Sequence, residues 1–134
     1  MKMNCVRDIM QLIESRYQGC AGNCFILPKE FLPKWSEQEV KYHLAIMAGQ
    51  FLKWSWWTRE ECYQIREITP MGVDFLVRSR DNRIWQIAMH AADDTMPFEP
   101  FMDLLKKITT ERALDYLGTD NPKETVPTFP GNER

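Results

Sequence analysis

"SEQEVKYHLAIMAGQFLKWSWW", residues 36–57, decides the fold, because a capped helix runs through a glycine into an aromatic strand. Ser36 and Glu39 form a capping box, in which the hydroxyl accepts from the amide of Glu39 and the carboxylate reaches back. Gly49 suits the position just after a helix, since glycine tolerates a left-handed backbone there. The stretch therefore predicts a helix that starts at Ser36, ends near Gly49 and leads into a strand.

The segments around this stretch complete the predicted domain. Apolar residues recur at helical spacing over residues 4–18, with Asn4 as a candidate N-cap. The apolar run 24–28 predicts a short strand, and 29–32 one helical turn. The aromatic strand and "CYQIREI" predict a hairpin joined by the polar residues 58–61. This order is typical of a winged helix-turn-helix, a mainly α fold with a small β-hairpin.

Two further helical segments follow the hairpin. Thr69 as N-cap and Pro70 at the first helical position predict a helix that continues, with a break, to about Ala92. The last helix, 101–118, could pack on its own domain or join two copies in a homodimer, through Phe98, Phe101, Leu105 and Ile108. Residues 1–117 are expected to form the winged-helix domain with this added C-terminal helix. Residues 118–134, which hold three prolines, are expected to form a disordered tail.

The composition suits one globular domain: 134 residues, 44% hydrophobic and 27% charged. No apolar run approaches the roughly 18–20 residues that span a bilayer. The first ten residues, "MKMNCVRDIM", carry an acid and an arginine where a signal peptide needs an apolar stretch. We therefore expect a cytosolic protein without membrane contact. Its formal charge of −2 argues against nonspecific nucleic-acid binding, although a local basic patch could still bind DNA.

Several stretches together resemble a bacterial, phage and prophage family, domain of unknown function 2513. They are "NCVRDIM", "SEQEVKYH", "REITPMGVDFL" and "RSRDNRIWQIA", which occur in this order between Asn4 and about Leu117. The resemblance implies a winged-helix-like fold and residence on mobile elements. It implies no activity and no functional residues, and the "KWSWW" segment and the proline-containing tail lie outside it.

Residues for catalysis or metal binding give little signal. Cys20 and Cys24 have a C-x3-C spacing that Cys62, His43 or His90 could complete as a zinc site. No second closely spaced pair exists, so free thiols are favoured. Nucleophile and phosphate-loop motifs are missing from the sequence, and His43 fits a partly buried, locally bonded histidine. We expect no enzyme activity, no cofactor and no metal.

The leading interpretation of the opening stretch is a DNA-binding transcriptional regulator. Its helix would enter the major groove while the hairpin contacts phosphates. The candidate contacts are Gln38, Lys41, Tyr42, Lys53, Arg59 and Arg66. Four acids balance the four cations over residues 36–66, which predicts weak, salt-sensitive affinity. The nearby arginines 78, 80 and 83 fit a solvated helix face better than a DNA contact.

The alternative interpretation is a protein-interaction module that binds a host or phage protein instead of DNA. Strand alternation places Leu52, Trp54 and Trp56 on one face and Lys53, Ser55 and Trp57 on the other. The first face predicts that Trp54 and Trp56 pack in the core. Trp57 is expected to be exposed, as protein-interaction anchors often are. The candidate partner-binding residues are Trp56, Trp57 and Arg59, and Trp85 is expected to hold two helices together.

Overall fold

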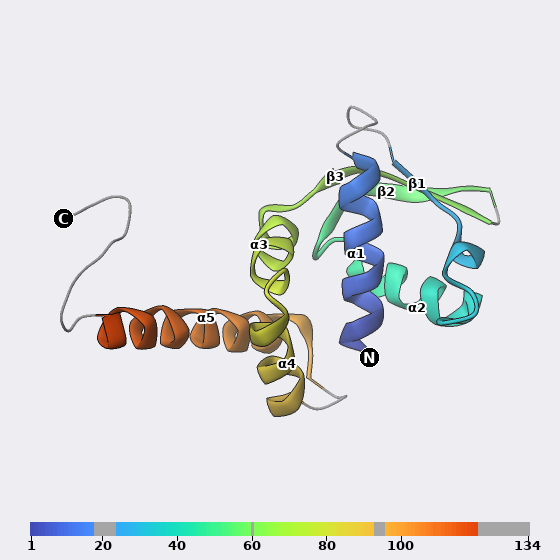
Figure 1. The fold of residues 1–134 in the computed structure, drawn as a ribbon. Helices are drawn as coiled ribbons and strands as arrows, with labels where there is room; N and C mark the ends of the chain where they lie inside the picture. The colour runs from blue at the N-terminus through green and yellow to red at the C-terminus, as the bar shows by residue number, and fades with distance from the viewer. Residues whose placement is uncertain (18–23, 60, 93–95, 121–134) are drawn as a thin grey trace.

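A computed structural model describes residues 1–17, 24–59, 61–92 and 96–120, without the side chains of Arg59 and of residues 114–120. Figure 1 shows the arrangement of its elements. In chain order these are α1 (Met3–Tyr17), β1 (Cys24–Ile26), the 3-10 helix η1 (Pro28–Phe31), α2 (Glu37–Met47), β2 (Leu52–Arg59), β3 (Cys62–Ile68), α3 (Pro70–Ser79), α4 (Asn82–Ala91) and α5 (Phe98–Asp120).

The N-terminal helix α1 runs through the middle of the molecule, with α3 and α4 on one side and α2 on the other (Figure 1). Its apolar residues recur every three or four positions, so one face is buried: Met3, Cys5, Val6, Ile9, Met10 and Ile13. Asn4 lies inside α1, and the prediction that it caps the helix is wrong. Its side chain instead accepts a hydrogen bond from the indole of Trp85 at 2.8 Å.

Helix α2 has the predicted start and end. The Ser36 hydroxyl accepts from the Glu39 N–H at 3.1 Å, and the Glu39 carboxylate accepts from the Ser36 N–H at 3.0 Å. Gly49 follows the last turn with φ +84°, a left-handed conformation that a residue with a Cβ rarely adopts. The predicted inward residues Val40, Leu44 and Met47 are buried. Local sequence thus determines both ends of α2 and its buried face.

The three strands form one antiparallel sheet in the order β1-β3-β2. The hairpin β2–β3 supplies two strands, and β1 adds to the other edge of β3. Phe25 of β1 and Trp56 of β2 both pair with Gln64 of β3. These three residues lie on the outer face of the sheet. The inner face packs toward α1 through buried residues, namely Cys24, Ile26, Tyr63 and Ile65.

The predicted break after the hairpin divides one helical segment into α3 and α4. Thr69 caps α3 by accepting from the Gly72 N–H at 3.0 Å. Asp81 caps α4 by accepting from the amides of Arg83 and Ile84 at 2.8 and 3.2 Å. The two helices form a corner, and Trp85 is buried there beside Phe75, as predicted for a residue that joins helices.

Helix α5 packs on its own domain through its first half. The side chains considered for a homodimer, Phe98, Phe101, Leu105 and Ile108, are buried in the core of their own chain. They are therefore not available to a second copy. The helix begins at Phe98, earlier than predicted, and continues to Asp120, past the expected domain end. Figure 1 shows its second half extending away from the sheet. Residues 121–134, most of the expected disordered tail, lie outside the described residues.

The fold is mainly helical, with a three-stranded antiparallel sheet that includes the β2–β3 hairpin. Helix, strand, helical turn, helix and hairpin follow in the order of a winged helix-turn-helix. One difference is local: the first helix of the helix-turn-helix is only the short η1. Helices α3 to α5 are added after the hairpin and cover α1 on the side away from β1 (Figure 1).

Candidate functional site

The outward side of α2 carries three of the predicted DNA contacts. Gln38 is exposed, Tyr42 is 55% exposed and Lys41 is half-buried. The exposure of Gln38 and Tyr42 therefore agrees with the prediction that this side of α2 faces outward. Only Lys41 among these three carries a charge, so this surface has one cation to offer a phosphate.

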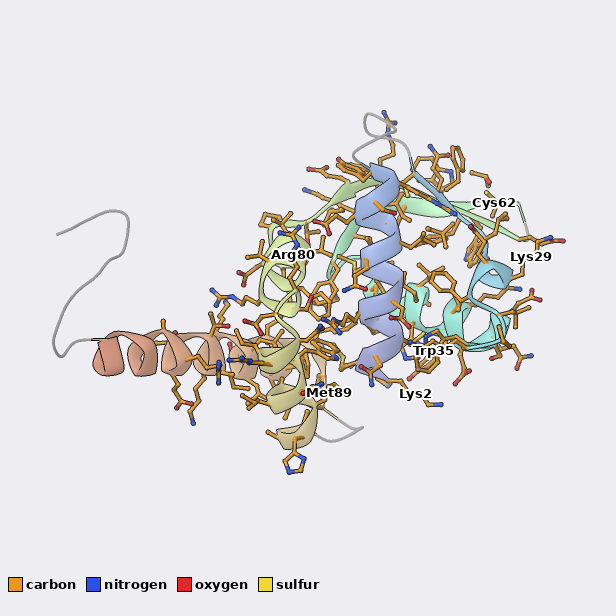
Figure 2. The ribbon with its side chains drawn as sticks, viewed as in Figure 1. Lys2, Lys29, Trp35, Cys62, Arg80 and Met89 are labelled. Atoms are coloured by element: carbon orange, nitrogen blue, oxygen red, sulfur yellow. The ribbon has the colours of Figure 1, made fainter. Side chains whose placement is uncertain are left out.

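Glu39, one of the acids on α2, is already engaged within the protein. The Lys2 ammonium lies 2.7 Å from its carboxylate, and Lys2 also lies over the ring of Trp35. The hydrogen bond from Lys2, with that from the Ser36 amide, lowers the pKa of Glu39 to about 2. Lys2 and Trp35 are labelled in Figure 2, near the lower end of α1. Glu39 therefore has a structural role in the cap and in the ion pair with Lys2. Its presence on α2 is evidence neither for nor against DNA binding.

His43 is more deeply buried than the sequence predicted, and it forms one long-range contact besides the predicted local one. It is 2% exposed, and its Nε2 accepts from the Lys2 backbone N–H at 2.9 Å. Nδ1 lies 2.6 Å from the Glu39 carbonyl oxygen, which requires the proton on Nδ1. Burial is the main cause that lowers the pKa of His43. The ring therefore stays neutral and holds the N-terminal residues against α2.

The hairpin cations predicted to contact phosphates are balanced by acids. Lys53 and Arg66 are exposed, and Lys53 pairs in the sheet directly with Glu67. The side chain of Arg59 lies outside the described residues. Lys29, labelled near Cys62 in Figure 2, is 3.7 Å from Glu61. The hairpin therefore presents no excess of positive charge within the described part of the chain.

Two of the three arginines that follow the hairpin, Arg78 and Arg80, form ion pairs. The Arg78 guanidinium lies 2.8 Å from Asp74 one turn earlier on α3. Arg80, labelled in Figure 2, forms an ion pair with Glu14 of α1. These contacts agree with the prediction of a solvated helix face. The pairs reduce the positive charge that this side could offer to a phosphate backbone.

Two tryptophans of β2 are exposed, which contradicts the prediction that they pack in the core. Trp54 is 64% exposed and Trp56 is 41% exposed. Trp54 has φ +55°, and this left-handed residue lies where strand alternation changes phase. Leu52 points inward, but the next inward residue is Ser55, whose hydroxyl lies 2.7 Å from the Tyr63 hydroxyl. The simple alternation rule therefore put both indoles on the wrong face.

A third exposed aromatic residue, Phe25, was not predicted. It is 47% exposed between two fully buried neighbours of β1, Cys24 and Ile26. Because Phe25 and Trp56 both pair with Gln64, they lie in one row across the outer face of the sheet. We call Phe25, Trp54 and Trp56 the aromatic surface. The signal for Phe25 was available in its strand, whose middle residue points away from the buried pair.

Trp57 has a different environment from its neighbours. It is 39% exposed, as its predicted role requires, but it pairs directly with the buried Tyr63. The two rings meet edge to face with centroids 4.8 Å apart. Trp57 therefore packs on the inner face of the hairpin through Tyr63, so that only part of its ring is available to a partner.

The edge strand that carries Phe25 is fixed to α1 by a short network. Arg16 of α1 donates to the Phe25 carbonyl oxygen at 2.8 Å and to the Glu30 carboxylate at 2.9 Å. Glu30 also accepts from the Leu27 amide at 2.8 Å. The hydrogen bond from Arg16 is the main cause that lowers the pKa of Glu30. This network holds β1 in place, so Phe25 is presented by an ordered backbone.

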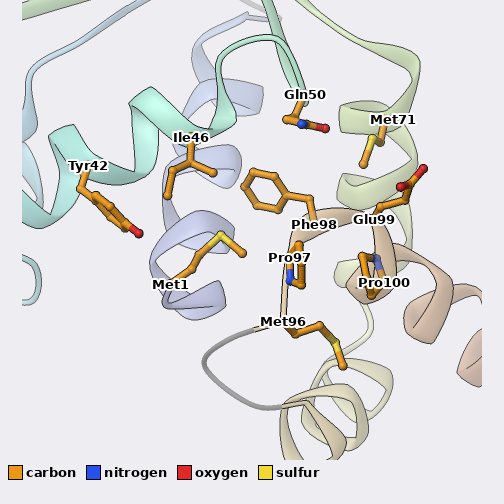
Figure 3. A pocket seen from close by; sticks show the side chains of 10 residues that line it. All are labelled: Met1, Tyr42, Ile46, Gln50, Met71, Met96, Pro97, Phe98, Glu99 and Pro100. Carbon is orange, nitrogen blue, oxygen red and sulfur yellow. The ribbon is translucent and has the colours of Figure 1, made fainter.

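A groove of about 970 Å³ lies beside α2 (Figure 3). In Figure 3, Tyr42 and Ile46 of α2 face Phe98 and the segment 96–100 across it, with Met1 at one side. Three methionines, Met1, Met71 and Met96, are among its lining residues. The segment 96–100 lies beside the C-terminal half of α2, which carries Tyr42 and Ile46. A DNA duplex that approaches this half of the helix would have to avoid that segment.

The remaining chemical candidates give no site. Cys5 and Cys24 are buried, and burial is the main cause that raises the pKa of Cys5 to about 12. Cys20 lies outside the described residues, so the C-x3-C pair is not seen as a whole. Among the residues that are described, no three histidines, cysteines or acids are grouped to hold a metal ion. None of the described helices has the length and apolarity that crossing a membrane requires.

The chain belongs to the family described as "Hypothetical protein (DUF2513)", whose model matches residues 1–96. The match confirms the resemblance found in the sequence and spans α1 to α4, including the whole sheet; α5 follows it. No curated protein and no solved structure matches the chain. The family description names no activity.

Proposed function

We propose that this member of the DUF2513 family is a non-enzymatic protein-interaction module that binds its partner through the aromatic surface. The observation that carries the proposal is the exposure of Phe25, Trp54 and Trp56, by 47%, 64% and 41%, on two strands of one small sheet. Large exposed apolar groups on a small domain usually mark an interaction site. Tryptophan is also among the residues that contribute most to binding at protein interfaces.

The backbone of Trp54 supports the same proposal. A left-handed conformation costs about 1–2 kcal/mol in a residue with a Cβ, and a bulky aromatic residue rarely adopts it. Trp54 has this conformation at φ +55° while most of its side chain stays exposed. Neither burial nor a favoured backbone accounts for a tryptophan here. Residues held in such conformations cluster at sites of catalysis and ligand binding.

DNA binding through α2 and the hairpin is the second candidate function. It is favoured by the winged-helix order of elements and by the exposure of Gln38 and Tyr42 on α2. It ranks second because acids balance the hairpin cations and the segment 96–100 stands beside Tyr42. A regulator would need several unopposed phosphate contacts in this region. In both cases the proposed location is the cytosol, as the sequence predicts.

Affinity capture with matched variants tests the proposal. The wild-type protein, Trp54→Ser/Trp56→Ser and Val73→Ser/Val77→Ser are immobilised and exposed to lysate of the producing cell. Val73 and Val77 are 48% and 55% exposed on α3, so the control also removes two exposed apolar groups. We expect a specific protein that the wild type and the valine variant retain and the tryptophan variant loses. Equal capture by all three would contradict the proposal.

A DNA titration separates the two candidates. Fluorescence anisotropy on random duplex DNA is recorded from about 50 to about 200 mM salt. The protein-interaction proposal predicts no binding, or weak binding that Gln38→Ala/Lys41→Ala leaves unchanged. Micromolar affinity that falls steeply with salt and is lost in Gln38→Ala/Lys41→Ala would instead support DNA regulation.

A further inference from the structure

We propose that the aromatic surface binds a proline-rich segment in the polyproline II conformation. The ligand we assign is the segment "VPTFP", residues 126–130, of a second copy of this chain. The inference rests on the proposed function, because it assigns a ligand to the same surface. It uses two features that the fold does not explain: the exposed tryptophans of β2 and the prolines that follow α5.

The spacing of the aromatic rings fits the ligand. Phe25 and Trp56 lie on the two outer strands, each paired with Gln64 of the central strand. Two strand spacings of about 4.8 Å separate their backbones by roughly 9.6 Å. A polyproline II helix repeats every three residues, which is about 9.3 Å. Pro127 and Pro130 are separated by one such repeat, so each proline ring can stand against one of the two aromatic rings.

The chemistry of the surface fits the same ligand. A polyproline II segment has no internal hydrogen bonds, so its carbonyl groups are open to donors, and its stiffness reduces the entropy lost on binding. Aromatic-lined grooves are the usual receptors of such segments. The indole N–H groups of Trp54 and Trp56 are donors only. Neither indole donates to any of the described residues, so both can reach a bound carbonyl group.

The charge of the segment is also compatible with this surface. Residues 121–134 carry two cations, Lys123 and Arg134, and two acids, Glu124 and Glu133. The sheet beside the aromatic surface is likewise balanced, since Lys53 stands opposite Glu67. Association would therefore depend on apolar contact and hydrogen bonds, with little effect of salt.

The direction of α5 argues for a second copy as the source of the segment. The helix is 23 residues long, about 34 Å, and its second half extends away from the sheet (Figure 1). The segment after Asp120 therefore starts on the opposite side of the molecule from its own aromatic surface. Exchange between copies places the prolines of one chain on the sheet of another. The protein would then self-associate in a way that a proline-rich partner can displace.

A peptide titration tests the inference on the full-length chain. The receptor is Pro127→Ala/Pro130→Ala, whose own segment no longer competes, and the probe is a labelled peptide of residues 121–134. We expect saturable binding that Trp56→Ser in the receptor weakens about tenfold or more. A peptide with both prolines replaced by alanine should not bind, and Val77→Ser in the receptor should have no effect. Absence of binding, or binding that Trp56→Ser leaves unchanged, would overturn the inference.

Sedimentation of the full chains gives an independent reading. The wild type should self-associate at concentrations at which both Pro127→Ala/Pro130→Ala and Trp56→Ser stay monomeric. Trp56 is exposed, and Phe25→Ser serves as a second variant if Trp56→Ser alters the unfolding midpoint. A wild type that stays monomeric overturns the inference. If the peptide fails while cellular capture still requires Trp56, only this ligand is wrong; if capture does not require Trp56, the proposed function itself fails.

Discussion

Trp85 and Asn4 lie 81 residues apart in the chain, yet the Trp85 indole donates a hydrogen bond to the Asn4 side-chain oxygen at 2.8 Å. Arg7 lies over the same indole ring, 4.9 Å from its centroid, and donates to the Ser79 carbonyl oxygen at 2.6 and 3.1 Å. It also donates to Asn82 at 2.8 Å. The segments "NCVRDIM" and "RSRDNRIWQIA", which resemble the family, thus contact each other. They hold α1 against the α3–α4 corner, so these contacts have a structural role.

Removing the Asn4 side chain tests this contact. Asn4→Ala leaves the indole N–H of Trp85, a residue only 3% exposed, without its protein acceptor. We expect the free energy of unfolding to fall by about 1 kcal/mol in urea titrations. Gln11→Ala, at an exposed position of the same helix, is the control and should change it by less than about 0.5 kcal/mol. Equal effects of the two substitutions would contradict a specific role for the contact.

Two glycines should differ in their sensitivity to alanine. A Cβ on Gly72 would lie 2.5 Å from the Phe51 carbonyl oxygen and 2.7 Å from Ile68 Cγ2. Gly72→Ala should therefore cost about 2–3 kcal/mol, as expected for an overpacked core. A Cβ on Gly49 meets nothing within 4 Å, and only φ +84° opposes it, so Gly49→Ala should cost about 1 kcal/mol. Urea unfolding of both variants measures the two losses of stability. A larger loss in Gly49→Ala than in Gly72→Ala would contradict the close packing around Gly72.

His43 should make stability depend on pH. Burial lowers its pKa below the ordinary 6.5, so the unfolded chain takes up a proton at a higher pH than the folded chain does. The contribution of the neutral His43 ring to the free energy of unfolding is complete above about pH 6.5 and is lost as the pH falls below that value. Protonation of Nε2 would also break the bond from the Lys2 N–H.

The measurement is the urea midpoint between about pH 7 and about pH 5. The fall in stability should be smaller in His43→Gln than in the wild type. His90→Gln, which replaces an exposed histidine, should behave as the wild type does. Below pH 4.5 a second loss of stability is expected from Glu39 and Glu30, whose pKa values are lowered in the folded protein. These carboxylates stabilise the fold above their ordinary pKa of 4.5, and the stabilisation disappears when they are protonated. An unchanged slope in His43→Gln would show that another group is responsible.

Trp54 should be replaceable by glycine at little cost in stability. Glycine adopts φ +55° without the steric cost that a Cβ brings, so Trp54→Gly should be about 1 kcal/mol more stable than Trp54→Ala. Thermal or urea unfolding of the two variants gives the difference. Both variants should lose partner capture equally, because both lack the indole. A Trp54→Ala variant that is the more stable of the two would argue against a left-handed residue at this position.

Local signals in the sequence predicted the starts of α2 and α3. Ser36 and Thr69 are recognisable caps because their partners lie three residues away, and both bonds are observed. Asn4 was predicted as a cap because it lies at the start of the apolar helical pattern. It was misread because its real partner, Trp85, is 81 residues distant. Caps can thus be identified from short sequence spacing unless a long-range contact uses the same side chain.

The aromatic surface was mispredicted because it depends on non-local geometry. The alternation rule assumes a regular strand, and the left-handed backbone of Trp54 reverses the phase after Leu52. The row formed by Phe25 and Trp56 exists only because both strands pair with Gln64. That register is set by tertiary packing, which a single sequence does not reveal. The DNA candidates Gln38 and Tyr42 were placed correctly because they follow from helical periodicity alone.

Site-specific photo-crosslinking in the producing cell tests the central claim, partner binding at the aromatic surface, most directly. A benzophenone analogue of phenylalanine replaces Phe25 in one protein and Tyr42 of α2, an aromatic control that is somewhat more exposed, in another. We predict a discrete protein adduct from position 25 that disappears when Trp56→Ser is added, and none from position 42. An adduct from position 42 alone, or equal adducts from both positions, would contradict the claim.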